Sequence, residues 1–361
     1  MQAKSFLLLG LLAIAMQLTA QNAPDSLRAG LVPGAPDSTK AQAYFALGQW
    51  YYRYNLDSGL HYYKKCLAYA DSTGQYAINA RNGLGYIHNI LGNYEKARSF
   101  FNVNYRLALE AQDTLLLAQA LGNTGNSLSY ETRYDTAITL YLETLKLFEA
   151  IGHPFGIATA NAVLGNLYIK SKHWDKAIGQ FRQTIRRFSG LNQTQALATS
   201  YMNMGIAFYH LENTDSAYHY NQKAYSLFKE IQNKRGMAQC LGSMGKIHFK
   251  NRDFQLSLDK YNEALGYFRK QGNTHSLVIA LMDISLNYDS LGRQQQALEY
   301  AKQAWEVAQE NKLLEEQAGV AYLLYKHFKL YANYEKALEY HEYHLQLDRK
   351  STRLNSSHYR T

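Results

Sequence analysis

Proline is scarce in this sequence. The chain of 361 residues contains only 4 prolines, Pro24, Pro33, Pro36 and Pro154. Helix interiors exclude proline because its ring removes an N–H donor and clashes with the preceding turn. The proline-free stretch from 155 to 361 therefore predicts one helix after another. Hydrophobic residues make up 47% of the chain, which is enough for a large core and excludes a disordered polypeptide.

Cysteine is equally scarce, with Cys66 and Cys240 alone. Two cysteines exclude a disulfide scaffold and any zinc site built on cysteine. We expect both thiols to be small, buried packing residues.

Motifs for catalysis are also missing. The sequence has no phosphate-binding loop, no nucleophile elbow and no glycine-rich strand turn. His341 and His344 lie three residues apart, not at the i, i+4 spacing of zinc proteases, and we interpret them as part of a polar face. Asp283 and Asp289 lack an obvious partner pair. We therefore predict no enzyme activity, no metal and no cofactor.

Two further histidines, His88 and His248, occupy a position of the repeat described below that elsewhere holds aromatic residues. We expect both to be packed and hydrogen-bonded rather than catalytic.

The excess of positive charge is mild. Residues 1–20 contribute one positive charge, Lys4, and residues 351–361 contribute two, Arg353 and Arg360. Without these three charges, the net charge falls from +9 to +6 for residues 21–350. This charge suits a soluble protein with an acidic partner, but it does not indicate nucleic-acid binding.

The first twenty residues have the pattern of a signal peptide. Lys4 precedes an apolar run, Phe6 to Met16, that is too short to span a bilayer comfortably. We predict cleavage after Ala20 and export, to the periplasm in a Gram-negative cell; an uncleaved anchor is the alternative. No other stretch is apolar enough to span a membrane.

The opposite end, residues 350–361, does not continue the helical pattern. Its sequence STRLNSSHYRT resembles a translated adaptor, so we expect the natural chain to continue differently after Lys350. An ordinary frayed terminus is the alternative.

Between these ends the sequence repeats every 40 residues. Four columns recur at this interval without an insertion. They are Gly85, Gly125, Gly165, Gly205, Gly245, Ser285, Tyr325; then Ala97, Ala137, Ala177, Ala217, Ser257, Ala297, Ala337; then Tyr105, Leu145, Ile185, Tyr225, Leu265, Trp305, Leu345; and Ala108, Phe148, Phe188, Phe228, Phe268, Ala308. A polar column, Asp113, His153, Gln193, Asn233 and Asn273, marks the turn between units. A shorter, imperfect unit precedes them around Gly48 and Tyr63.

Within one unit, small residues such as Gly165 and Ala177 allow two helices to cross closely. Large residues follow at helical spacing on the same face. Each unit is therefore predicted to be a helix hairpin with a short turn such as Lys172-His173. Because one hairpin cannot bury its apolar face alone, the units must stack.

Leu164-Gly165-x-x-Tyr168 followed by Trp174, Ala177 and Phe181 resembles the tetratricopeptide repeat signature. The resemblance covers residues 38–349 and implies an all-α, right-handed superhelical solenoid of about eight hairpins. The unit of 40 residues, longer than the usual 34, resembles the long-repeat members found in bacterial sensory regulators. Residues 21–37 are expected to form a linker with a short cap helix from Asp25 to Leu31, and Asp37 or Ser38 to cap the first repeat helix.

In this family the first helix of each hairpin lines a concave face. Applied to this chain, the resemblance places an amide-rich row there: Asn82, Asn89, Asn123, Asn126, Asn166 and Asn203, followed by Lys246 and Lys250. Asparagine offers both a donor and an acceptor, so the row suits the backbone of an extended peptide, and the lysines favour an acidic one. A merely solvated helix face is the alternative. The carboxylate clamp of chaperone-binding members is excluded, because Ala162, Gln239 and Ser243 stand where three of its five residues belong.

We therefore predict an exported protein–protein interaction module, the sensory or scaffolding input region of a longer signalling protein. A complete, free periplasmic adaptor is the second hypothesis. A groove for a small ligand or an enzymatic reaction is the third.

Overall fold

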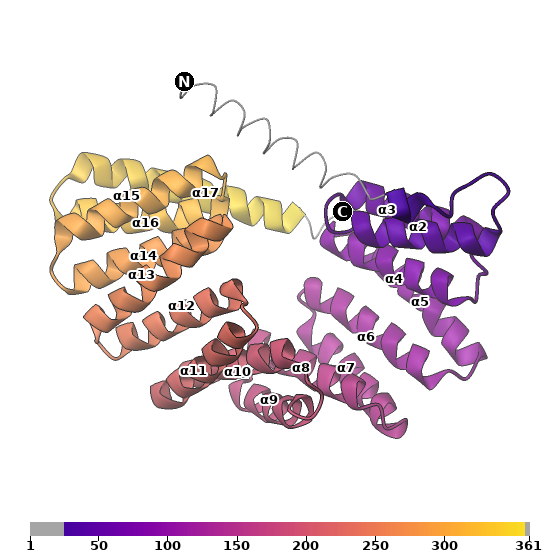
Figure 1. Ribbon diagram of the computed structural model, residues 1–361. Coiled ribbons are helices and arrows are strands. Elements are labelled where there is room, and N and C mark those ends of the chain that lie inside the picture. Colours follow the sequence, from indigo (N-terminus) through magenta and orange to yellow (C-terminus); the bar gives the residue numbers. More distant parts are fainter. Residues whose placement is uncertain (1–24, 358–361) are drawn as a thin grey trace, which may run out of the picture. The chain divides into compact units, whose positions relative to one another are not determined.

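The computed structural model describes residues 25–357, so the predicted signal peptide lies outside the described residues. The described chain forms a short 3-10 helix and sixteen α-helices, without a strand (Figure 1). The elements are η1 (Asp25–Arg28), α2 (Asp37–Tyr51), α3 (Leu56–Tyr69), α4 (Gln75–Ile90), α5 (Tyr94–Glu110), α6 (Thr114–Tyr130), α7 (Tyr134–Ala150), α8 (Pro154–Lys170), α9 (Trp174–Phe188), α10 (Thr194–His210), α11 (Thr214–Glu230), α12 (Lys234–Lys250), α13 (Phe254–Gln271), α14 (Thr274–Ser290), α15 (Gln294–Glu310), α16 (Leu314–Leu330) and α17 (Tyr334–Ser357). Paired in chain order from α2, they form eight hairpins, which confirms the predicted all-α repeat solenoid.

The helices fall into two compact units. Unit 1 extends to Leu167 and unit 2 begins at Tyr168, so the boundary lies within α8. One core cluster of unit 1 surrounds Tyr63 and Leu84, whereas the core of unit 2 runs from Ala198 to Ala337. Each unit therefore has its own hydrophobic core.

The glycine column marks close contacts within the hairpins. A Cβ atom added to Gly85 would lie 2.3 Å from the ring of Phe101, and one added to Gly245 would lie 2.8 Å from the ring of Tyr261. The second-helix ring therefore lies directly on the bare backbone of the first helix. Ala177, in the facing column, is completely buried, as its position in the repeat predicts.

Two serines replace members of these columns, and each joins the two helices of its own hairpin by a hydrogen bond. The Ser285 hydroxyl, in the glycine column, donates to the carbonyl of Ala297 at 2.7 Å. The Ser257 hydroxyl, in the alanine column, donates to the carbonyl of Gly245 at 2.8 Å. Both hydroxyls are buried, and each satisfies its donor on the backbone of the facing helix.

The turns repeat every twenty residues. From Gly92 to Ala332, a residue with positive φ follows the end of each helix. Only four of these residues are glycines, namely Gly92, Gly152, Gly272 and Gly292. The polar column follows one residue later, where the side chains of Asp113, Asn233 and Asn273 accept hydrogen bonds from backbone N–H groups three residues on. The sequence therefore specifies where each hairpin begins.

The ends of the repeat region differ from prediction. Helix α2 starts at Asp37, and its N-cap is Pro36 without a side-chain hydrogen bond, so the prediction of Asp37 or Ser38 as a capping residue was wrong. The Asp37 carboxylate instead accepts from Lys40 Nζ at 3.3 Å. At the other end α17 runs to Ser357, past Arg349, where the repeat pattern ends.

Both cysteines are free and buried, which confirms their predicted packing role. Burial raises the pKa of the Cys66 thiol to about 11, so this thiol is protonated at neutral pH and a weak nucleophile.

Candidate functional site

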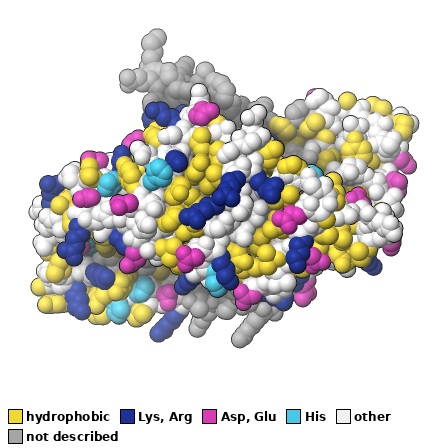
Figure 2. All heavy atoms as spheres, turned by 90° about the horizontal axis from the view of Figure 1, so that it is seen from below, with side chains coloured by type: hydrophobic (Ala, Val, Ile, Leu, Met, Phe, Trp, Pro, Cys, Tyr) yellow, Lys and Arg dark blue, Asp and Glu magenta, His cyan; other side chains and the backbone are white. Residues whose placement is uncertain are grey.

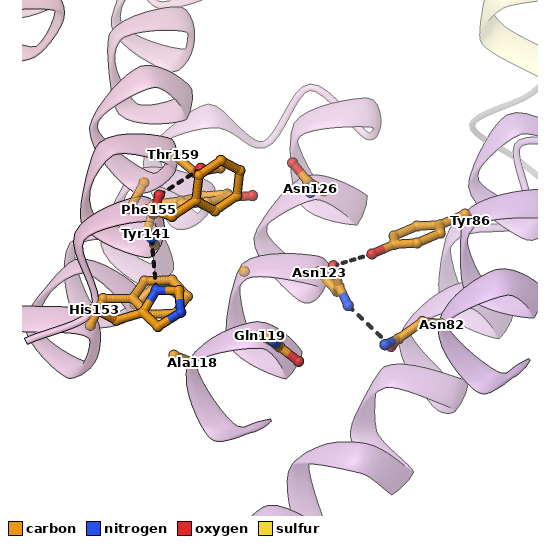
Figure 3. A pocket seen from close by; sticks show the side chains of 15 residues that line it. Asn82, Tyr86, Ala118, Gln119, Asn123, Asn126, Tyr141, His153, Phe155 and Thr159 are labelled. Atoms are coloured by element: carbon orange, nitrogen blue, oxygen red, sulfur yellow. Dashed lines mark hydrogen bonds between the residues drawn. The ribbon is translucent and has the colours of Figure 1, made fainter. Parts of the chain in front are cut away.

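A hollow of about 480 Å³ opens in unit 1, between α4, α6, α7 and the first turns of α8. Figure 3 shows its two sides: amide side chains from α4 and α6 face Phe155 and Thr159 at the start of α8. Its fifteen lining residues include no lysine, arginine, aspartate or glutamate. The hollow is therefore an uncharged site with both polar and aromatic walls.

A chain of hydrogen bonds fixes the amide wall. The Tyr86 hydroxyl donates to Asn123 Oδ1 at 2.8 Å, and Asn123 Nδ2 donates to Asn82 Oδ1 at 3.1 Å (Figure 3). Asn82 Oδ1 also accepts from Nδ2 of the fully buried Asn104 at 3.0 Å. Arg81 in turn donates to Asn104 Oδ1 at 3.3 Å. This network joins α4, α5 and α6 and holds the amides in fixed orientations.

The network leaves donors unused. Asn82 Nδ2 has no partner among the described residues, because both hydrogen bonds of this side chain go to its oxygen. Asn123 Nδ2 uses one of its two N–H groups. Asn126 is hydrogen-bonded to the buried Tyr141, whose pKa is raised by burial. The wall can therefore donate hydrogen bonds to carbonyl groups of a ligand.

The opposite wall is aromatic and held by the start of α8. His153 Nδ1 accepts from the N–H of Gly156 at 2.9 Å, so the imidazole caps the helix (Figure 3). A Cβ atom added to Gly156 would lie 2.4 Å from the ring of Phe148, so the ring packs on the bare backbone of this glycine. Phe155 projects from this first turn with 49% of its surface exposed. An exposed phenylalanine beside a hollow offers apolar area to a ligand.

The structure brings three of the predicted amides to this hollow, namely Asn82, Asn123 and Asn126. Asn123 is only 8% exposed, so its expected free exposure was wrong. Asn89 was also expected to be exposed, but it is buried and both of its amide atoms lack partners among the described residues. Asn166 is half-buried on α8 and engaged in contacts of its own.

Three residues of the hollow were missed from the sequence. Tyr86 lies in the same repeat column as Asn126, so the column could have revealed it. Tyr141 covers Gly125, with its ring 2.9 Å from the position of an added Cβ, so it contributes to the helix crossing as well as to the hollow. Phe155 lies at a position without a conserved type within the repeats, so no sequence signal marked it.

The remaining predicted residues lie in unit 2. Asn203 is half-buried on α10 and engaged in contacts, and Lys246 is exposed on α12. Lys250 is not free, because its Nζ pairs with Glu212 at 3.1 Å and lies 5.1 Å from the centre of the Tyr209 ring. Of the two lysines, Lys250 is therefore the one that pairs with a carboxylate at salt-bridge distance.

Both aspartates of α14 have partners, contrary to the sequence-based expectation. Asp283 is hydrogen-bonded to the buried Tyr261, and burial raises the pKa of its carboxyl although Lys246 and this hydrogen bond lower it. Asp289 Oδ1 lies 3.5 Å from His327 Nδ1.

The second of these pairs extends to a serine. His327 Nε2 lies 3.2 Å from the Ser285 hydroxyl, so serine, histidine and aspartate stand in the order of a hydrolase triad. However, Ser285 is fully buried, His327 is 1% exposed, and the serine proton goes to the Ala297 carbonyl. No substrate can reach this hydroxyl, so the cluster is a packing element.

The histidines predicted to be packed are packed. His88 stacks on Phe100 at 5.8 Å, but neither ring nitrogen has a hydrogen-bond partner among the described residues, so the expected hydrogen bond was wrong. His248 lies edge-on to Tyr218. His344 Nδ1 lies 3.0 Å from the Ala318 carbonyl, and His341 stacks on Tyr325. The described part of the chain contains no group of three side chains able to hold a metal ion.

Sequence profiles match the repeat region. The profile described as tetratricopeptide repeat matches residues 75–150 and 236–310. A profile described as anaphase-promoting complex subunit 5 matches residues 166–250. A comparison with curated proteins finds no significant match.

Solved structures share the fold. The apo quorum sensor NprR from B. thuringiensis has a TM-score of 0.66 and 13% identity, covering 96% of this chain and 94% of that one. A Rap protein complexed with competence and sporulation factor has a TM-score of 0.58 and 13% identity, covering 87% and 85%. A signal transduction ATPase with a tetratricopeptide repeat sensor from Pyrococcus horikoshii has a TM-score of 0.64 and 14% identity; the match covers 79% of this chain and 46% of that one. The chain thus spans about half the length of this last protein.

These likenesses show the fold and support a protein–protein interaction scaffold. Among the described residues, no helix combines the length and apolar character needed to cross a membrane.

Proposed function

Because this chain is a tetratricopeptide-repeat protein, we propose that it is a non-enzymatic interaction module whose hollow in unit 1 binds an extended segment of a partner protein or peptide. The observation that carries the proposal is the hydrogen-bonded amide wall with unused donors at Asn82 and Asn123, opposite the exposed Phe155. Fixed amide donors match the carbonyl groups of a peptide backbone, and the ring matches an apolar side chain.

The uncharged lining limits the ligand. A charged side chain entering the hollow would lose hydration without gaining an opposite charge. The bound segment therefore places neutral residues there, with an apolar side chain against Phe155. Acidic residues of the segment, if present, would lie outside the hollow.

The roles of two fold neighbours favour a sensory role for this chain. One is a quorum sensor, and another contains a tetratricopeptide repeat sensor within a larger signalling protein. We place this chain in the same class, as the input region of a signalling protein. The signal-peptide pattern of residues 1–20 supports export, to the periplasm in a Gram-negative cell. A free periplasmic adaptor remains the second hypothesis.

A small uncharged ligand is another candidate, favoured by the size of the hollow. Its volume of about 480 Å³ falls within the range typical of small-molecule sites. The experiment below separates the two candidates, because only a peptide ligand is recovered from a peptide library.

The test is selection of a random displayed peptide library on the purified chain, followed by calorimetry with the selected peptides. Phe155→Ala should weaken binding about tenfold, because it removes an aromatic contact area. Leu109→Ala is the matched control: Leu109 is also about half exposed (50%) in unit 1 but does not line the hollow. Equal affinities for wild type and Phe155→Ala, or an equal loss in both variants, would contradict the proposal.

A further inference from the structure

Positive charge is concentrated on one helix of unit 2. Residues 172–187, which span α9, contain five cations and one carboxylate, for a net charge of +4. The equivalent stretches of the other six second helices in register carry between −2 and +2. The cations of this stretch are all exposed: Lys172 in the turn before α9, and Lys176, Arg182, Arg186 and Arg187 on the helix. Figure 2 shows a row of Lys and Arg side chains on the face seen from below, the side on which Figure 1 draws α9.

One of these cations interrupts an apolar column. The position of Arg187 holds a half-buried apolar or tyrosine side chain in each of the other six repeats. These residues are Leu107, Leu147, Leu227, Tyr267, Val307 and Leu347. Arg187 is exposed, so a position that elsewhere contributes to packing contributes a charge here.

Carboxylates are also replaced on α9. Gly179 stands where three later repeats have acids, at Asp259, Glu299 and Glu339. A Cβ added at Gly179 would meet nothing within 4 Å, so packing within this chain does not require glycine. Glycine destabilises a helix interior relative to alanine. It leaves the backbone open between Lys176 and Arg182 on the exposed face.

The arginines of α9 are not neutralised. Among the described residues, the guanidinium groups of Arg182, Arg186 and Arg187 form no ion pair or hydrogen bond, whereas Arg98 and Lys250 pair with glutamates. Three guanidinium groups on neighbouring turns therefore keep all their donors available for a partner.

The positive strip is one helix wide. Helix α9 has 15 residues and is about 22 Å long. The second helix of the next hairpin, α11, exposes the carboxylates of Asp215 and Glu230. A membrane surface or a nucleic-acid duplex would extend over neighbouring helices and meet these acids, whereas a single segment of protein would not.

From this pattern we infer that the exposed face of α9 docks an acidic protein segment, whose carboxylates pair with the guanidinium groups and whose backbone passes close to Gly179. Guanidinium forks bind carboxylates through two parallel hydrogen bonds. This surface is distinct from the hollow of unit 1, which contains no charged side chain, so it adds a second binding surface to the proposed function.

The probe is a fluorescent peptide of alternating glutamate and alanine, about seven residues long so that the extended chain matches the length of α9. Fluorescence anisotropy measures its binding to the whole chain at low and physiological salt. The triple change Arg182→Glu, Arg186→Glu and Arg187→Glu should weaken binding at least about tenfold, because it replaces attraction with repulsion. A second triple variant, with glutamine at the same three positions, should also weaken binding. It controls for misfolding of the glutamate variant.

The matched control reverses three exposed cations of α13 and the turn before it, in the same unit: Arg252→Glu, Arg269→Glu and Lys270→Glu. It changes the net charge equally, so the affinity should stay within about twofold if α9 is the site. Equal weakening by both triple variants, or no binding by wild type at low salt, would overturn the inference.

Two further arms decide the class of partner and the role of Gly179. A single-stranded oligonucleotide and phosphatidylserine vesicles should bind more weakly than the acidic peptide; tighter binding of either would overturn the assignment. Gly179→Leu should weaken peptide binding about threefold or more by blocking close approach to the helix. Unchanged affinity would contradict the predicted passage of the ligand there.

Discussion

At the scale of single residues, the unpaired imidazole of His88 has a measurable consequence. It is 4% exposed, and burial lowers its pKa, with Lys96 and Lys64 acting in the same direction. The unfolded chain takes up the proton near the ordinary pKa of about 6.5, whereas the folded chain resists it. The free energy of unfolding should therefore be constant above about pH 6.5 and fall as the pH decreases toward the folded pKa.

Replacing this imidazole should reduce the acid sensitivity. His88→Phe introduces the residue found at the equivalent positions Phe208 and Phe328. Urea unfolding at several pH values from about 7.5 to 5 should show a shallower loss of stability for the variant than for wild type. Some loss should remain, because burial also lowers the pKa of His327 although Asp289 raises it. Parallel curves for the two proteins would show that His88 is not the titrating group.

Residue types also decided which predictions succeeded. The glycine and alanine columns could be interpreted from sequence, because only a small side chain fits where Gly245 meets Tyr261. The burial of Asn89 and Asn123 could not be predicted from the sequence, because it depends on which neighbouring side chains cover each helix. The pairing of Asp289 with His327 joins residues 38 positions apart in different hairpins, and no local pattern marks it.

At the scale of one element, two of the three glycines of helix α12 have opposite roles. A Cβ at Gly245 would lie 2.8 Å from the Tyr261 ring, whereas one at Gly242 would meet nothing within 4 Å. Gly245→Ala should lower the free energy of unfolding by about 1–3 kcal/mol through overpacking. Gly242→Ala should raise it by about 0.5–1 kcal/mol, because alanine favours the helix.

Chemical denaturation of the two variants beside wild type measures both effects, and each glycine is the control for the other. Destabilisation of similar size in both would mean that the repeat column does not identify the helix crossing.

The secondary-structure elements were predicted from the sequence more fully than the contacts of single residues. A repeat of 40 residues divides into two helices and two turns, and the regular placement of Asp113, Asn233 and Asn273 locates the turns. Positive φ at residues such as Thr132 and Glu212 could not be predicted, because glycine usually marks such positions. The helix ends are specified here by the repeat and not by glycine.

At the scale of the whole molecule, a uniform repeat contains local differences that the repeat itself conceals. The sequence predicts one solenoid, and the structure divides it into two compact units with the boundary inside α8. The charged face of α9 lies where one repeat departs from its column, at Arg187, and the exposed Phe155 of the hollow lies at a position that the repeat leaves variable. Function in this chain is therefore expected from the departures, and stability from the columns.

The most direct test of the central claim locates a bound peptide on the chain. A peptide selected from the displayed library, carrying a photoreactive phenylalanine analogue at its apolar position, is cross-linked to the protein and the adducts are mapped by mass spectrometry. We predict adducts on α4, α6 and the first turns of α8, around Asn82, Asn123 and Phe155. Adducts confined to other helices, with none at these positions, would contradict the assignment of the hollow as the binding site.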